Sequence, residues 1–432
     1  MCLDDGGAGA IRLDAGEARS ATAGAARLAT MRALILTNEY PPNVYGGAGV
    51  HVEYLTRELA RLIDVDVRTF GAQDEQSERL RVRGFPIAHD VSAATEQLRP
   101  LWSALSRDLG FVAEPVTADV VHCHTWYTHL GGILAKIAYG IPLIITTHSL
   151  EPLRPWKREQ LGGGYDVTSW LERTAIEMAD AVIAVSGETR ADVLRLFNVP
   201  EERVAVIHNG IDTDEYRPQE ASDALDRYGI DRAVPFVLFV GRITRQKGIV
   251  HLVRAIRHLD PGIGVVLCAG APDTPEIAAE MEAGVAAARA EHANVVWIPE
   301  MVDKPTVRQL YSHAAVFCCP SVYEPFGIIN LEAMACETAV VASAVGGIPE
   351  VVVPGETGLL VGFESASGES FDPRDPERFA RDLAAAINEL MADPARRVAM
   401  GRAGRRRAVE HFGWAAIARQ TVELYESLVR PS

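Results

Sequence analysis

The sequence predicts an α/β protein with two Rossmann-like, doubly wound domains that face each other across a cleft. Three observations support this prediction. The chain has 432 residues, 48% of them hydrophobic, which is enough for two or three domains with buried cores. Short apolar runs alternate with longer segments of helical periodicity in two successive series. A polar, turn-rich stretch from Asn209 to Pro218 separates the two series.

Each series is expected to form one sheet. The apolar runs are continuous rather than alternating, which is typical of parallel strands buried on both faces. In the first series we expect strands at 33–37, 65–70, 120–124, 143–148, 181–186 and 204–208, and helices at 50–62, 168–179 and 188–197. In the second series we expect strands at 236–240, 265–269, 295–298, 316–319, 340–343 and 359–361, and helices at 249–259, 276–290, 307–314, 330–336 and 376–391.

These elements divide the chain. Residues 1–30 are rich in Ala, Gly and Asp and are expected to be a disordered tail, without the pattern of a secretory signal. An N-terminal domain follows at 31–217 and a C-terminal domain at 218–411. Residues 412–432 are expected to form a C-terminal helix, with a return to the N-terminal domain left open. The domains are expected to meet only near residue 217 and at this helix, which would permit hinge motion.

The composition limits the partners and the compartment. The formal net charge of −16 repels nucleic acid and anionic membranes, and no window reaches the roughly 18 uncharged apolar residues that span a bilayer. The six cysteines are scattered, as in a cytoplasmic protein with reduced thiols. The basic run 405–407 is interpreted as a solvated helix end. The oligomeric state, including a homo-oligomer, and any allosteric effector are left open.

Two loops that follow predicted strands carry groups suited to an anion. Gly46, Gly47 and Gly49 precede a helix, where glycines let backbone N–H groups approach a phosphate, although a tight turn is the alternative. Arg242 follows the strand at 236–240, and Lys247 lies where the next helix begins. The two cations could converge on a departing diphosphate without a metal, and solvated loop charges are the alternative.

Two acidic residues follow the strand at 316–319. Glu324 lies in the loop, and Glu332 lies eight residues on, in the next helix. Pro325 suits the start of that helix and Gly327 keeps its backbone accessible, so its free N–H groups can face a phosphate. Carboxylates accept hydrogen bonds from the paired hydroxyls of sugars. In isolation, two Glu residues at this spacing carry little information.

Three histidines invite a functional interpretation. His148 lies at the end of the strand at 143–148 and is expected to face the cleft, although a structural histidine is the alternative. His122 and His124 share one face of a strand, but no third metal ligand is evident. The nucleotide-type loops also lack a DxD motif that would hold Mg²⁺. We therefore expect no metal and no cofactor.

In this order along the chain, the motifs resemble the retaining GT-B glycosyltransferases of the GT4 family. The resemblance runs from Met31 to about Leu428. Its most specific marks are Glu324 and Glu332 as E-x7-E, Arg242 with Lys247, and the segment 344–350. Within the family, segment 38–51 is similar to the branch of actinobacterial glycogen synthases and α-maltose-1-phosphate synthases. The resemblance implies a GT-B fold with an acceptor-side N-terminal domain and a nucleotide-sugar-binding C-terminal domain.

The resemblance also implies how the diphosphate of the donor is held. Arg242 and Lys247 match the pair of cations that binds it. Backbone donors to the phosphates match three residues at the start of a helix, namely Gly327, Ile328 and Ile329. The family works without a metal, and the leaving phosphate takes the acceptor proton during a front-face attack that retains the anomeric configuration.

The remaining implied roles concern the sugars. Glu332 matches the residue that binds the ribose hydroxyls, and Glu324 matches the residue at the donor hexose. His148 matches the histidine beside the transferred sugar, and Gly47 matches the N-domain glycine near the diphosphate.

The resemblance points to ADP-glucose as the donor and to glucose 1-phosphate or an α-1,4-glucan as the acceptor. Bacterial glycogen synthases of the GT5 family carry Lys-x-Gly-Gly near the N-terminus, but here Val44 stands in the lysine position. Glucan elongation of the GT5 kind is therefore in doubt. The alternatives are a GT4 enzyme with another sugar or acceptor, a GT-B sugar-nucleotide epimerase, and a binding module without catalysis.

Overall fold

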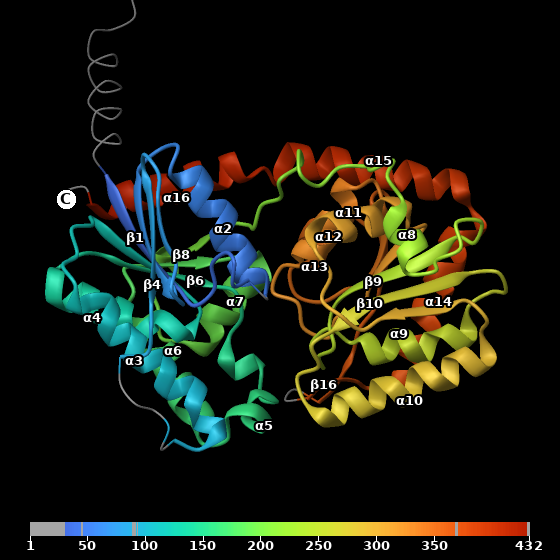
Figure 1. The fold of residues 1–432 in the computed structure, drawn as a ribbon, viewed down its shortest axis with the longest axis horizontal. Coiled ribbons are helices and arrows are strands. Elements are labelled where there is room, and N and C mark those ends of the chain that lie inside the picture. The colour runs from blue at the N-terminus through green and yellow to red at the C-terminus, as the bar shows by residue number, and fades with distance from the viewer. Residues whose placement is uncertain (1–30, 45, 89–91, 93, 368–369, 430–432) are drawn as a thin grey trace, which may run out of the picture.

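The computed structural model describes residues 31–429 apart from 45, 89–91, 93 and 368–369. The expected tail at 1–30, Cys2, Tyr45 and residues 430–432 lie outside the described residues. Two sheets, each enclosed by helices, form the two halves of the molecule (Figure 1). The predicted α/β class with two doubly wound domains is confirmed.

The N-terminal sheet has eight strands within the described residues, in the order β3-β4-β2-β1-β5-β6-β7-β8. Its neighbouring strands are parallel except for β3 and β4. The strands are β1 (Arg32–Thr37), β2 (Asp64–Phe70), β3 (Asp74–Gln76), β4 (Leu80–Phe85), β5 (Val120–His124), β6 (Leu143–Thr147), β7 (Ala181–Ala184) and β8 (Val204–Val206). The strand order reverses between β1 and β5, which is the topological switch point of this sheet.

Helices cover both faces of this sheet because its strands are apolar on both sides. Ala33 and Ile35 of β1 pack on one face, and Leu34 and Leu36 pack on the other. The first face is covered by α2 (Gly47–Leu59) and α16 (Trp414–Val429), and the second by α3 (Arg99–Ala113), α4 (His129–Tyr139), α6 (Gly164–Met178) and α7 (Gly187–Leu196). Shorter pieces are η1 (Glu96–Leu98), η2 (Trp126–Thr128), η3 (Glu151–Leu153), α5 (Lys157–Leu161) and η4 (Glu201–Arg203).

The C-terminal sheet is parallel, with the described strands in the order β11-β10-β9-β12-β13-β14. They are β9 (Phe236–Arg242), β10 (Gly264–Gly270), β11 (Val295–Ile298), β12 (Val316–Cys319), β13 (Ala339–Ser343) and β14 (Gly358–Val361). The switch point lies between β9 and β12. A separate antiparallel pair comprises β15 (Ser365–Ser367) and β16 (Ser370–Pro373).

The C-terminal sheet is also covered on both faces. One core cluster joins it to α9 (Ile249–Ala255), η5 (Ile256–His258), α10 (Pro275–Glu291) and α14 (Pro376–Ala392). The other joins it to α8 (Asp223–Arg227), α11 (Lys304–His313), α12 (Ile328–Ala335), α13 (Ile348–Val351) and α15 (Pro394–His411). Helices α15 and α16 run along one edge of the molecule, from the C-terminal half to the N-terminal half (Figure 1).

The two domains meet through more contacts than the sequence predicts. Ser186 Oγ donates a hydrogen bond to the Pro325 carbonyl at 2.7 Å, and Lys304 Nζ lies 3.0 Å from Glu53. The Glu350 carboxylate accepts from the Gly187 N–H at 2.9 Å, at the N-terminus of α7. The expectation that the domains touch only near residue 217 and at the last helix is therefore wrong, because loops at both sheet edges approach each other.

Three further details differ from the predictions. Strands β3 and β4 and the β15–β16 pair were not predicted, because β4 alternates polar and apolar residues instead of forming an apolar run. The strand predicted at 143–148 ends at Thr147, so His148 begins the following loop. The basic run 405–407 lies within α15, where Arg405 donates to the Tyr216 carbonyl and Arg407 to the Glu350 carbonyl, so it is not a solvated helix end.

Helix α16 lies on the N-terminal domain. The Trp414 ring stacks on Tyr54 of α2 with 5.9 Å between the centroids, and the Tyr425 hydroxyl lies 2.6 Å from Nδ1 of His122. Among the described residues no helix is both long and apolar enough to cross a membrane. The five described cysteines are free and buried.

Candidate active site

The predicted site residues lie at the carboxyl ends of strands in both sheets. Gly47 begins α2 after β1, and His148 follows β6. Arg242 ends β9, and Glu324 follows β12. Strands β1, β9 and β12 border the two switch points, where open α/β sheets bind their ligands. The fold therefore directs these residues to the interface between the domains.

Lys247 and Glu324 form a close ion pair. Lys247 Nζ lies 2.6 Å from Glu324 Oε2, and the two side chains are 22% and 8% exposed. The Ser321 hydroxyl donates to the same carboxylate oxygen at 3.2 Å. Burial disfavours the ammonium, but Glu324, Cys319 and Glu332 together outweigh that effect and raise the pKa of Lys247. Lys247 is therefore held as a cation directly beside the Glu324 carboxyl group.

Two glycines allow the loops of this pair to approach each other. Gly248 has φ +61°, and a Cβ there would lie 2.1 Å from the Pro320 carbonyl oxygen. The neighbouring Val322 N–H donates to the Gln246 carbonyl at 3.0 Å. Gly346 has φ +53°, and a Cβ there would lie 1.9 Å from the Glu324 carbonyl oxygen. Only glycine fits these two positions, which explains part of the 344–350 motif.

Arg242 does not join the Lys247–Glu324 pair. Its Nη2 lies 2.5 Å from Asp273 Oδ1, with side chains 36% and 11% exposed. Asp273 follows β10, the strand next to β9, and was not predicted as a site residue. Asp273 could have been found from the sequence, because it is a carboxylate that follows the strand next to the one that ends at Arg242.

The N-terminus of α12 meets the N-terminal domain. Gly327 has φ +97° and caps the helix, so Ile328 and Ile329 are its first residues. A Cβ on Gly47 would lie 3.9 Å from Cδ1 of Ile328. The first residues of α2 and α12 therefore lie close together across the domain interface. Helix N-termini favour anions, and at α2 the Glu39 carboxylate already accepts a hydrogen bond from the Gly46 N–H at 2.8 Å.

Glu332 is buried in α12, one helical turn after Ile328. Its Oε2 accepts a hydrogen bond from the Tyr311 hydroxyl at 3.0 Å, and Tyr216 is a second hydroxyl partner. Burial raises the pKa of Glu332 to about 7, against the lowering effect of the two tyrosines. Neither tyrosine was predicted. Glu332 is thus held in a defined orientation but carries only a partial negative charge at neutral pH.

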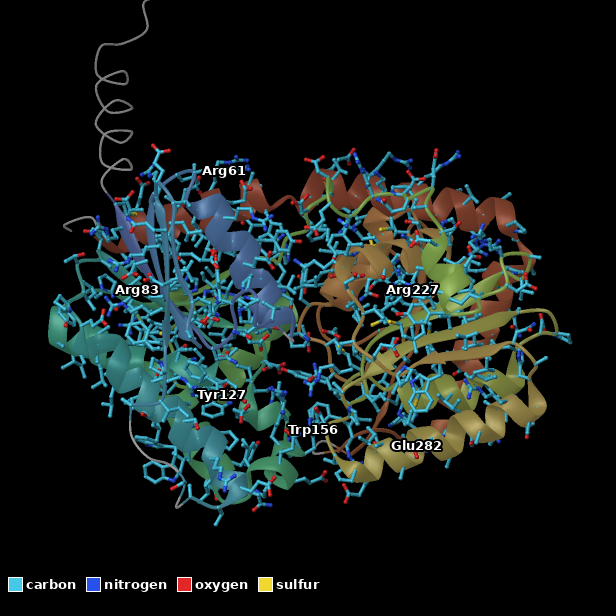
Figure 2. The ribbon with its side chains drawn as sticks, in the orientation of Figure 1. Arg61, Arg83, Tyr127, Trp156, Arg227 and Glu282 are labelled. Atoms are coloured by element: carbon cyan, nitrogen blue, oxygen red, sulfur yellow. The ribbon has the colours of Figure 1, made fainter. Side chains whose placement is uncertain are left out.

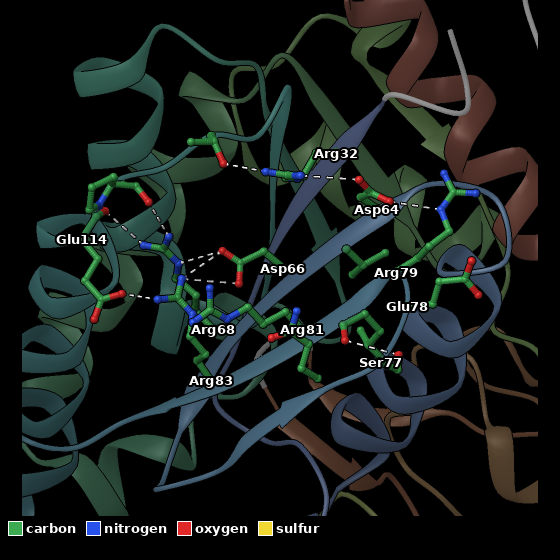
Figure 3. A pocket seen from close by; sticks show the side chains of 15 residues that line it. Arg32, Asp64, Asp66, Arg68, Ser77, Glu78, Arg79, Arg81, Arg83 and Glu114 are labelled. Carbon is green, nitrogen blue, oxygen red and sulfur yellow. Dashed lines mark hydrogen bonds and ion pairs between the residues drawn. The ribbon is translucent and has the colours of Figure 1, made fainter. Parts of the chain in front are cut away.

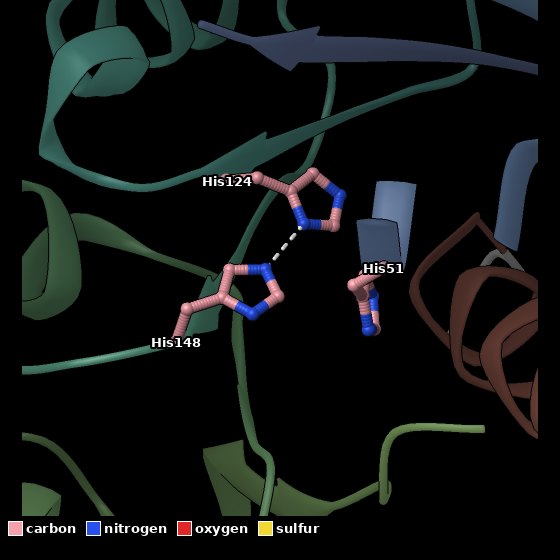
Figure 4. A group of neighbouring side chains, drawn as sticks. All are labelled: His51, His124 and His148. Atoms are coloured by element: carbon pink, nitrogen blue, oxygen red, sulfur yellow. Dashed lines mark hydrogen bonds between the residues drawn. The ribbon is translucent and has the colours of Figure 1, made fainter. Parts of the chain in front are cut away.

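His148 belongs to a cluster of histidines in the N-terminal domain, with His51 and His124 (Figure 4). Its Nε2 lies 3.0 Å from Nδ1 of His124, and its ring lies 4.7 Å from that of His51. Burial, together with His51 and His122, lowers the pKa of His148 well below its usual value. His148 is therefore neutral near pH 7 and can exchange hydrogen bonds with a sugar without adding charge.

The fold brings ring nitrogens of three histidines close together, an arrangement that was not predicted from the sequence. One nitrogen each of His51, His124 and His148 lies within 4.8 Å of the others. His122, the other residue considered for a metal, uses both ring nitrogens, one toward Tyr425 and one toward Thr146 at 2.6 Å each. The side chain of His122 is therefore held by Tyr425 and Thr146 and does not join the three clustered histidines.

A pocket lies in the N-terminal domain, near the amino ends of β1, β2 and β4 (Figure 3). Arginines line it, and several of them pair with acids there. Arg79 Nε lies 3.1 Å from Asp64, and Arg83 Nη2 lies 3.1 Å from Asp66. Its charges largely neutralise one another, so we do not assign the active site to this pocket.

Two Rossmann-like sheets with cations, carboxylates and helix N-termini at facing switch points define a GT-B glycosyltransferase. The family model described as "Glycosyltransferase Family 4" matches residues 45–215, and the model described as "Glycosyl transferases group 1" matches residues 222–407. Among solved structures, a sucrose-phosphate synthase from Thermosynechococcus elongatus has a TM-score of 0.76 at 27% identity. The match covers 92% of this chain and 99% of that one.

Curated relatives narrow the class. The α-maltose-1-phosphate synthase of Mycolicibacterium smegmatis is 51% identical over 402 residues, which cover 92% of this chain and all of that protein. The enzyme of the same name from Mycobacterium tuberculosis is 48% identical with the same coverage. The chain therefore belongs to glycosyltransferase family 4, in the branch of the α-maltose-1-phosphate synthases. It is a retaining hexosyltransferase.

Proposed function

We propose that the protein transfers an α-glucosyl group from ADP-glucose to glucose 1-phosphate or to an α-1,4-glucan, with retention of configuration. The observation that supports this proposal best is the Lys247–Glu324 pair, 2.6 Å long, at the switch point of the C-terminal sheet. It offers a cation for the outgoing phosphate and a carboxylate for sugar hydroxyls within one small region. The names of the curated relatives support the glucosyl group and the phosphorylated acceptor.

In the proposed mechanism, the diphosphate lies between the N-termini of α2 and α12. Lys247 and Arg242 approach it from the C-terminal domain and neutralise the charge that develops on the leaving group. Their present partners, Glu324 and Asp273, hold both cations ready before the donor arrives. Because two protein cations supply this charge, we propose that neither a metal nor a cofactor is required.

The other predicted residues bind the sugars. Glu324 accepts hydrogen bonds from the donor hexose, and Glu332, positioned by Tyr311, accepts from the ribose hydroxyls. His148 contacts the transferred sugar as a neutral imidazole. The leaving phosphate takes the proton of the acceptor hydroxyl on the same face of the sugar. Alignment of the two substrates by both domains lowers the entropic part of the barrier.

We also propose that the enzyme works in the cytoplasm. Its five described cysteines are buried and unpaired, as expected where thiols remain reduced.

Product analysis tests the proposal. The enzyme is incubated with ADP-glucose and either glucose 1-phosphate or glycogen, and the products are separated and identified by NMR. We expect ADP release that depends on the acceptor, and an α-linked product. A changed sugar nucleotide formed without an acceptor would indicate an epimerase instead. Tight donor binding with no product under any condition would indicate a binding module. Other nucleoside diphosphate sugars in the same assay test the donor.

A further inference from the structure

Three histidines of the N-terminal domain come together from elements that border the switch point of its sheet. His124 ends β5, His148 follows the neighbouring strand β6, and His51 lies in α2, the helix after β1. His124 Nδ1 lies 3.0 Å from His148 Nε2, and the ring centroids of His51 and His148 are 4.7 Å apart (Figure 4). Segments far apart in the sequence therefore bring three imidazoles to one place.

Two of these histidines have a buried nitrogen without a partner. His51 Nδ1 lies 2.6 Å from Oδ1 of Asn209, an atom that only accepts hydrogen bonds, so Nδ1 carries the proton and Nε2 keeps its lone pair. His51 is 2% exposed and His124 is fully buried, and Nε2 of each has no hydrogen-bond partner among the described residues. Metal-ligating histidines usually donate one N–H to an oxygen in this way and use the other nitrogen for the ion.

The spacing of the three rings suits a single ion. One nitrogen of each histidine lies within 4.8 Å of the others. Zn–N bonds of about 2.0–2.1 Å in a tetrahedral site hold two nitrogens about 3.3 Å apart, so a movement of about 1.5 Å at most brings the three nitrogens into place. His148 begins a loop and is partly exposed, which gives its ring the freedom for this movement.

The chemistry of these side chains selects the kind of ion. Burial is the main cause that lowers the pKa of His51 to about 4 and the pKa values of His124 and His148 well below their usual value. Neutral imidazoles bind Zn²⁺ and other late transition ions, whereas Mg²⁺ and Ca²⁺ prefer oxygen ligands. Within the part of the chain that the structure describes, this group of ligands contains no carboxylate.

The group lies close to the interface between the domains. Trp156, in the segment that begins at His148, lies between the two halves of the molecule (Figure 2), and its ring centroid is 5.0 Å from that of Phe371 in the C-terminal domain. An ion can therefore reach His148 from the interface. A tetrahedral ion with three protein ligands keeps a fourth position for water or another ligand.

We propose that His51, His124 and His148 bind one Zn²⁺ ion, or a similar late transition ion, and that this ion inhibits the enzyme. The inhibition rests on the proposed function, in which His148 contacts the transferred sugar as a neutral imidazole. A bound ion occupies the lone pair of His148 and places a dication where that sugar lies. The ion is thus an inhibitor and not a cofactor, which agrees with the metal-independent transfer proposed above.

Calorimetry with Zn²⁺ tests the binding without substrates, on the full chain after treatment with EDTA and dialysis. His51→Asn removes the free Nε2 but keeps an amide N–H near the position of Nδ1, for Asn209. His129→Asn is the matched control, because His129 is buried in the same domain, its ring nitrogens have no partner among the described residues, and it lies outside the group. Co²⁺ is a second probe, since its visible spectrum reports tetrahedral coordination.

We expect the wild type and His129→Asn to bind one Zn²⁺ per chain. Loss of an outer partner of a ligand weakens metal binding about tenfold to a hundredfold, so loss of the ligand itself in His51→Asn should weaken it by at least about a hundredfold. Asn209→Asp should instead tighten binding by about tenfold or more, because a carboxylate makes the His51 imidazole more basic. This variant keeps all three ligands and decides the question if His51→Asn does not fold.

ADP release from ADP-glucose measures the inhibition. Zn²⁺ at a concentration that saturates the site should suppress ADP release by the wild type, EDTA should restore it, and Mg²⁺ should have no effect. The residual rate of His51→Asn should not respond to the same concentration of Zn²⁺. If Zn²⁺ acted by binding the nucleotide, both proteins would be inhibited alike.

The inference would be overturned by a wild type that binds no Zn²⁺ in stoichiometric amount, or by Zn²⁺ affinities that are unchanged in His51→Asn and Asn209→Asp. Bound Zn²⁺ that leaves ADP release unchanged, or equal inhibition of the wild type and His51→Asn, would overturn it as well. If the wild type transfers no glucosyl group from ADP-glucose, the proposed function fails, while calorimetry still decides whether the metal site exists.

Discussion

Replacement of Lys247 by Met tests the proposed role of the cation most directly. The substitution removes the ammonium group and keeps the stem, whose Cγ would lie 3.9 Å from a Cβ on Gly241. Glu324, only 8% exposed, would keep the Ser321 hydroxyl but lose its counter-ion. Removing one partner of a buried ion pair lowers the free energy of unfolding by about 3–5 kcal/mol. Because Lys247 is partly exposed, we expect a loss near the lower end of this range, about 3 kcal/mol. For a domain of this size we expect Tm to fall by about 6–12 °C.

The effect on turnover should exceed the effect on stability. One lost donor to a developing negative charge costs about 2.7–4 kcal/mol of transition-state stabilisation, which lowers kcat by about a hundredfold to a thousandfold. The double variant Lys247→Met with Glu324→Gln separates the two effects. It leaves no unpaired buried charge, so Tm should recover while kcat remains low.

The assay combines ADP release at saturating substrates with thermal unfolding of each variant. Lys136→Met is the matched control, because Lys136 forms an ion pair of the same length, 2.6 Å, with Asp180 in the N-terminal domain. This control should leave kcat unchanged. A kcat of Lys247→Met within about threefold of the wild type would refute the assignment of Lys247 to the leaving group.

Further predictions concern nucleotide binding, loop geometry and the domain interface. Glu332→Gln should weaken binding of ADP-glucose. The affinity of the wild type for ADP-glucose should rise as the pH passes through 7 and Glu332 loses its proton, whereas the affinity of Glu332→Gln should not change with pH. Identical pH profiles of the two proteins in calorimetry would contradict this prediction. Because the folded pKa of about 7 lies above the usual 4.5, Glu332 should also stabilise the fold fully below pH 4.5, and this contribution should disappear as the pH rises through 7. Gly248→Ala should destabilise the fold more than Gly229→Ala and should also lower kcat. Both glycines have positive φ, but only Gly248 lies close to the backbone of another segment. Equal free energies of unfolding for the two variants would contradict this prediction. Glu350→Ala should free the N-terminus of α7 and let the domains open, which small-angle scattering would detect as a larger radius of gyration; an unchanged radius would show that the other contacts suffice.

Some features of this protein follow from its sequence alone. Continuous apolar runs indicated the parallel strands, because strands buried on both faces need apolar residues at every position. The order of strands and helices then indicated two doubly wound sheets. It also placed Arg242, Glu324 and His148 after strands, at the edge where such sheets bind ligands. The alternating strand β4 escaped detection because its polar positions broke the apolar run.

The tertiary structure alone decided which of these groups meet. The partners Lys247 and Glu324 are 77 residues apart, and their contact depends on β9 and β12 becoming neighbours and on Gly248 allowing two loops to touch. Asp273, which pairs with Arg242, and Tyr311, which orients Glu332, follow from the same neighbour relations. Local periodicity reports which face of an element is buried. It cannot report which distant side chain that element will approach, because such contacts arise when the sheets and domains assemble.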